Sequence, residues 1–172
     1  VSAFIGYSIG TAPIIGYNYG SKNDAEMKNI FKKSMGAITL FSLVLTAASL
    51  FLAAPISKIY VGYDGELFNL TVYAFRMFST SYLIIGFNIF GSAFFTALNN
   101  GKVSALVSFN NGAISAAISF LRTLLFQILA IFVLPAVFGK NAIWLSITVA
   151  EAATLMITVA FLIANRKKYR YA

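Results

Sequence analysis

The sequence predicts an all-α protein, a polytopic transmembrane bundle of about five spans. Two observations predict this class. The chain is 59% hydrophobic and only 10% charged, whereas a soluble domain carries about 25% charged residues, so lipid must surround most of its surface. Several long stretches also lack Lys, Arg, Asp and Glu, and a helix needs about 20 apolar residues to cross the hydrocarbon core. These stretches are residues 1–21, 34–57, 77–101 and 103–121.

Turn-forming and charged residues set the limits of each predicted span. A polar loop follows the first span near Tyr19, and a basic helix start then leads into the second span, which ends at Pro55. Clusters of Gly, Asn and Asp with charged residues, which favour turns, precede the third, fourth and fifth spans. The expected spans are residues 1–19, 34–54, 67–98, 103–134 and 142–164.

The basic helix start carries a capping signal. Glu26 follows Asn23 by three residues. This spacing predicts a capping box, in which the two side chains each satisfy a free amide at the first turn.

Basic residues lie mostly on one predicted side of the membrane. Because cytoplasmic loops carry an excess of Lys and Arg, we expect a bundle over residues 1–165 and a basic cytoplasmic tail over residues 166–172, in the cell membrane. An odd number of spans beginning in mid-helix predicts a piece of a longer protein. The richer side carries Lys22, Lys28, Lys32, Lys33, Lys102, Arg166, Lys167, Lys168 and Arg170, and the other side Lys58 and Lys140.

Composition also excludes several kinds of function. The chain has no Cys and no His, which removes thiolate metal sites and imidazole bases, and the predicted spans hold a single carboxylate. We therefore expect no enzyme, no cofactor and no metal site. The net charge is +8, and the basic residues alternate with apolar spans instead of forming one patch. No nucleic-acid partner is therefore expected.

An internal repeat lies at the start of the fourth span. Residues 99–109 read NNGKVSALVSF and residues 110–120 read NNGAISAAISF. Eleven residues form about three helical turns, so the second copy lengthens a helix without rotating its faces. Either the long helix projects into the cytoplasm, or it breaks at residues 110–112, where turn formers cluster. The break is the preferred interpretation.

Four polar side chains inside the predicted spans are candidates for a substrate or ion path, since such groups are costly in lipid and face a bundle interior or a water path. Glu151 in the fifth span is either a site for a proton or a cationic substrate, or the partner of Arg122 in an interhelical ion pair. Arg76 in the third span either lines the path or extends to the membrane surface. Asn88 lies nearer the middle of the same span.

Small residues crowd the first span, among them Gly10 and Gly16. Such residues let helix backbones approach closely. Pro13 lies between them and lacks a backbone N–H, so it is expected to bend the helix and free a carbonyl toward a cavity.

The order of these features resembles one transporter family. The stretch GTAPIIGYNYGSKN over residues 10–23, the Pro-ended second span and the turn at residues 64–66 are similar to multidrug and toxic compound extrusion (MATE) transporters. So are ALNNGK at residues 97–102, SFLRT at residues 119–123, and IWL before Glu151. The resemblance covers essentially the whole chain.

The resemblance implies twelve spans in two six-helix lobes, of which this chain supplies the last five. It further implies export of organic cations, driven by inward flow of sodium ions or protons, with a missing N-terminal lobe of the same polypeptide as partner. The acidic residue that some members carry in the third of these spans is absent here, and Asn88 is the nearest polar candidate. Two alternatives stay open: a flippase for lipid-linked saccharides in the same superfamily, and a non-transporting membrane subunit.

Overall fold

The computed structural model describes residues 1–62, 65–99 and 120–171, and in these ranges it contains helices and no strand. The predicted all-α class is therefore confirmed. The helices are α1 (Ser2–Gly20), α2 (Asp24–Val61), α3 (Gly65–Ser79), α4 (Tyr82–Asn99), a π-helical segment (Leu121–Phe126), α6 (Gln127–Phe138), a 3-10 segment (Lys140–Leu145) and α7 (Ser146–Tyr169).

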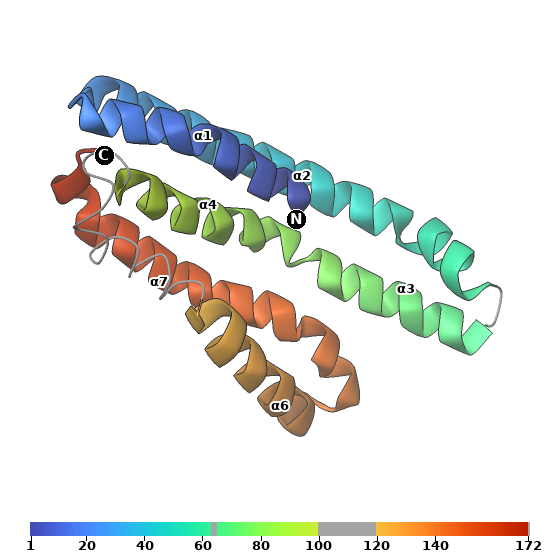
Figure 1. Cartoon of the computed structure of the whole chain (residues 1–172). Coiled ribbons are helices and arrows are strands. Elements are labelled where there is room, and N and C mark those ends of the chain that lie inside the picture. Colours follow the sequence, from blue (N-terminus) through green and yellow to red (C-terminus); the bar gives the residue numbers. More distant parts are fainter. Residues whose placement is uncertain (63–64, 100–119, 172) are drawn as a thin grey trace.

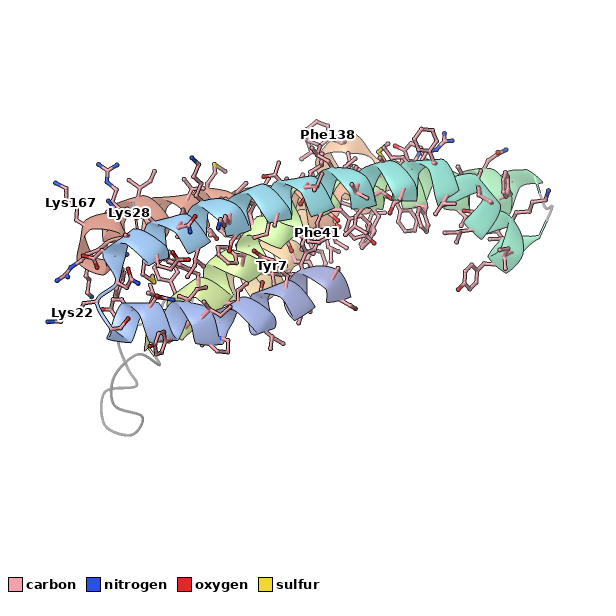
Figure 2. The ribbon with its side chains drawn as sticks, turned by 90° about the horizontal axis from the view of Figure 1, so that it is seen from above. Tyr7, Lys22, Lys28, Phe41, Phe138 and Lys167 are labelled. Carbon is pink, nitrogen blue, oxygen red and sulfur yellow. The ribbon has the colours of Figure 1, made fainter. Side chains whose placement is uncertain are left out.

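Helix α4 is the centre of the bundle (Figure 1). Helices α1 and α2 pack on one side of it and α7 on the other, while α6 packs against α7 and α3 packs against α2. The antiparallel pair α1 and α2 is joined by Tyr7, whose hydroxyl donates to Ser34 Oγ at 3.0 Å and whose ring meets Phe41 edge-on (Figure 2).

The core lies along α4. Phe90, Phe94 and Phe95 are each at most 1% exposed and pack with Phe31 of α2 and with the end of the chain. Gly86 allows α1 to approach, because a Cβ there would lie 2.5 Å from the Phe4 ring. Large aromatic rings thus fill the centre where small residues bring the helices together.

In the part of the chain that the structure describes, two helical segments are long and apolar enough to cross a membrane, Asp24–Val61 and Lys140–Tyr169. The pair Gly65–Ser79 and Tyr82–Leu98 makes a third if it counts as one span, bent by 42°. The 12-residue helix α6 is too short for the same test, and α1, rich in Gly, Ser, Thr and Asn, does not meet it. Within the described residues, two or three spans thus qualify by length and composition, against about five predicted.

The bend divides the predicted third span into two helices. Ser79 donates to the carbonyl of Phe75 and Thr80 to that of Met77, each at 2.7 Å. Hydroxyls that bond to carbonyls of the preceding turn often bend helices, so the run of hydroxyl residues at positions 79–81 favours the break.

The capping box forms only in part. Asn23 Oδ1 accepts from the Glu26 amide at 3.2 Å, as predicted. The Glu26 carboxylate, however, accepts from Asn29 Nδ2, and the Asn23 amide donates to the carbonyl of Asn18. The last turn of α1 therefore supplies the bond that the capping box assigns to Glu26.

Two further expectations concern the end and the middle of the chain. Helix α7 continues to Tyr169, so most of the predicted tail over residues 166–172 is helical. The predicted break at residues 110–112, and nearly all of the internal repeat, lie outside the described residues.

Candidate functional site

A cavity of about 930 Å³ opens beside the central helix. Helices α1 and α4 supply most of its wall, and α7 contributes Ile147 and Glu151. Tyr17 and Phe78 place aromatic rings in the wall, while Asn88 and Glu151 place polar groups there. A largely apolar wall with few polar groups is typical of small-molecule sites.

A hydrogen-bonded network fixes the polar part of this wall. Asn88 Nδ2 donates to Oε2 of Glu151 at 2.7 Å and to the Glu151 backbone carbonyl at 2.9 Å. Thr158 Oγ1 in turn donates to Asn88 Oδ1 at 3.0 Å. The three residues are 0–5% exposed, so the network joins α4 to α7 away from the surface.

The orientation of the Asn88 amide follows from its partners. The Glu151 backbone carbonyl can only accept a hydrogen bond. The amide must therefore turn its NH₂ group toward Glu151 and its oxygen toward Thr158. Thr158 thus holds Asn88 in the position that places an N–H on the Glu151 carboxyl.

Helix α1 adds two further polar features to the cavity. Ser8 is 1% exposed, and its hydroxyl has no hydrogen-bond partner among the described residues. Pro13 has no backbone N–H, so the carbonyl of Ile9 lacks its regular donor one turn later. Ser8, Ile9 and Pro13 all line the cavity, so both features lie in its wall.

The comparison with protein families decides what kind of protein this is. The MatE family model matches residues 1–121, which is more than half of the chain. The chain belongs to the MatE family. No curated protein and no solved structure matches it significantly. MatE proteins are transporters and not enzymes, so this chain is a multi-pass membrane protein of a transporter family.

The match to MatE contains part of the site. Asn88 and the cavity wall of α1 and α4 lie within residues 1–121, whereas Glu151 and Thr158 lie beyond them. The contact between Asn88 and Glu151 thus links the MatE region to α7.

The four path candidates separate in the structure. Asn88 and Glu151 are brought into contact at the cavity. Arg76 is exposed on α3 and is not among the described residues that line the cavity. The side chain of Arg122 lies outside the described part of the chain, and with it the alternative ion pair to Glu151.

The three packing candidates in α1 also differ from one another. Gly16 is buried and lines the cavity, and Pro13 lies within the continuous helix α1 at the same wall. Gly10 is exposed, and a Cβ there would meet nothing within 4 Å. The described part of the chain therefore makes no close helix contact at Gly10, whereas Gly86 and Gly91 of α4 make such contacts.

Sequence reasoning missed Thr158 and Ser8. Thr158 follows Glu151 by seven residues, with Thr154 between them, so all three lie on one helical face. All three are buried. Polar residues at this spacing in an apolar helix are the signal that could have identified Thr158. Ser8 had no such signal, because small polar residues recur throughout α1.

Proposed function

We propose that the protein is a secondary active transporter that exports organic cations from the cell in exchange for sodium ions or protons. The observation that carries this proposal is the carboxyl of Glu151, 5% exposed, held by Asn88 at the wall of a cavity of about 930 Å³. A carboxylate removed from water attracts a cation strongly.

Exchange requires two ligands that compete for one site. A proton or a sodium ion neutralises the carboxylate in one state, and an organic cation does so in the other. Tyr17 and Phe78 in the cavity wall add rings suited to a large organic cation. In this proposal the chain works in the cell membrane with an N-terminal lobe of the same polypeptide, and its C-terminus is cytoplasmic.

The alternative of a flippase for lipid-linked saccharides is less well supported. Such substrates carry phosphate groups, so their path calls for basic residues. Among the described residues that line the cavity there is no Lys or Arg. Membership in a transporter family likewise speaks against a non-transporting subunit.

The test uses the full-length protein in vesicles loaded with a fluorescent organic cation. A sodium gradient is imposed first and a proton gradient second, with Glu151→Gln as the variant. Glu66→Gln is the matched control, because Glu66 is exposed in the first turn of α3. We expect one gradient to drive dye movement in the wild type and in Glu66→Gln, and the movement to be lost in a folded Glu151→Gln.

Two results would contradict the proposal. Dye that stays in place under both gradients would reject cation antiport and direct the search to lipid-linked substrates. Wild-type transport by Glu151→Gln would remove the buried carboxyl from the mechanism.

A further inference from the structure

Two basic segments from opposite ends of the chain meet at one end of the bundle. One begins helix α2 and the other ends helix α7, and Figure 2 shows Lys22, Lys28 and Lys167 at the same end. We call the basic residues of these two segments the basic rim, and all of them are exposed. The basic rim consists of Lys22, Lys28, Lys32, Lys33, Arg166, Lys167, Lys168 and Arg170.

The last residues of the chain hold the two segments together. Arg170 adopts a left-handed conformation (φ 57°, ψ 30°) that ends α7 and turns the chain back onto the bundle. Tyr171, 2% exposed, then packs its ring 4.9 Å from Phe31 of α2 and 4.8 Å from Phe94 of α4, between ring centroids. Its hydroxyl donates to the carbonyl of Leu162.

Two further contacts fix the same corner. Tyr169, 2% exposed, meets Tyr19 of α1 edge-on with ring centroids 5.8 Å apart. Arg170 Nη1 lies 3.4 Å from Oδ2 of Asp24 at the start of α2. The end of α7 is therefore anchored to α1, α2 and α4, and the basic rim is a preformed surface.

The basic rim carries an excess of positive charge. Its two segments contain Asp24 and Glu26 as their only acidic residues. Asp24 is paired with Arg170, and Glu26 accepts from Asn29. The remaining cations repel one another and attract anions at close range.

The position of the basic rim indicates which anion it meets. Exposed apolar residues follow the rim on both helices: Leu40 and Phe41 on α2, and Val159 and Ile163 on α7. Leu40 is seven residues beyond Lys33, or about 10 Å along the helix. A basic rim this close to exposed apolar residues lies at the depth of lipid phosphates.

We infer that the basic rim is a docking surface for the headgroups of anionic phospholipids. The phosphates lie against the cations of α2 and α7, and the acyl chains lie along the apolar residues beside them. Docking of this kind favours the anchored form of the chain end, because only that form holds both basic segments on one surface.

The test measures thermal unfolding of the full-length protein in phosphatidylcholine discs, with and without added phosphatidylglycerol. We expect phosphatidylglycerol to raise Tm by about 2–4 °C. Lys28→Gln with Lys167→Gln should remove most of this gain, with lipid affinity in native mass spectrometry falling about fivefold for each lost charge. Both positions are exposed, so these substitutions remove charge without opening the core.

The matched control is Lys58→Gln with Lys140→Gln, which removes two charges at the other end of the bundle and should keep the full gain. An equal gain in the rim and control variants would overturn the inference. So would an undiminished gain at high salt, where exposed charges are screened, or an equal gain from inorganic phosphate in phosphatidylcholine discs. The measurements at high salt and with inorganic phosphate use the wild-type protein and need no variant.

Discussion

The side-chain amide of Asn88 lies 2.7 Å from Oε2 of Glu151 and 2.9 Å from its backbone oxygen, although the two residues are 63 positions apart. One side chain of α4 thereby satisfies both a carboxyl and a main-chain carbonyl of α7. The contact fixes the central helix against the last one and orients the carboxyl at the cavity wall.

Replacing Asn88 by Ala should destabilise the protein. The substitution removes two hydrogen bonds from Asn88 to Glu151 and the one that Asn88 accepts from Thr158, and the loss of buried hydrogen bonds costs about 1–3 kcal/mol. The free energy of unfolding in detergent measures the effect. Asn69→Ala is the control, because Asn69 is exposed on α3 and its loss should change stability little. Equal losses of stability at the two positions would show that the hydrogen bonds of Asn88 do not stabilise the folded protein.

Gly91 and Thr158 form a second contact between the same helices. A Cβ at Gly91 would lie 2.5 Å from Cγ2 of Thr158. Gly91→Ala should therefore cost about 1–3 kcal/mol through overpacking. Adding Thr158→Ser should restore most of that loss, because serine lacks the methyl group yet keeps the hydroxyl that donates to Asn88. A double-mutant cycle measures the coupling.

The control for this cycle is Gly10→Ala. A Cβ at Gly10 meets nothing within 4 Å, and Ala favours a helix over Gly by about 1 kcal/mol. Stability should therefore be unchanged or higher. A loss at Gly10 equal to that at Gly91 would rule out steric contact with Thr158 as the cause.

These contacts show how far the sequence predicts the site. Asn88 and Glu151 were identifiable because polar groups are rare in apolar spans. The composition of each span also indicates which residues form its helix. Their pairing was not identifiable, because it depends on how α4 is rotated against α7, which one sequence does not encode in any local pattern. The close approach was predicted at Gly10, yet it occurs at Gly86 and Gly91, since packing depends on the neighbour as well as on the small residue.

The fold was predictable to a similar degree. Hydrophobic stretches and turn residues located the helices, whereas the 42° bend between α3 and α4 was missed. The hydroxyl run at positions 79–81 lies inside an apolar stretch, where it is compatible with a straight helix as well as with a bent one. The anchored chain end was also missed, because charge alone predicts a solvated tail and the burial of Tyr169 and Tyr171 depends on distant aromatic residues.

Asn23 should stabilise the start of α2 through its cap. Its Oδ1 accepts from the Glu26 amide at 3.2 Å, and loss of such a cap costs about 1 kcal/mol. Asn23→Ala should therefore lower Tm by about 2–4 °C. Asn23→Asp keeps an acceptor and places a negative charge at the helix N-terminus, so it should preserve Tm. Equal losses in the two variants would mean that the cap contributes through the backbone alone.

Tyr171 should make the anchored chain end sensitive to alkaline pH. Burial, together with repulsion from Tyr169, raises the pKa of Tyr171 from 10.0 to about 12 in the folded protein. Below pH 10 the phenol is neutral in both states, so its contribution to stability is complete. Between pH 10 and about 12 the phenol ionises in the unfolded chain first, and the contribution is progressively lost.

The measurement is the free energy of unfolding in detergent across this pH range, for the wild type and Tyr171→Phe. Phe cannot ionise, and it loses the bond to Leu162, worth about 1 kcal/mol. The wild type should therefore be the more stable below pH 10, and its advantage should shrink as the pH rises to about 12. Tyr17→Phe is the control for the loss of a tyrosine hydroxyl, since Tyr17 is 75% exposed. A constant difference for Tyr171→Phe would show that folding does not raise the pKa of Tyr171.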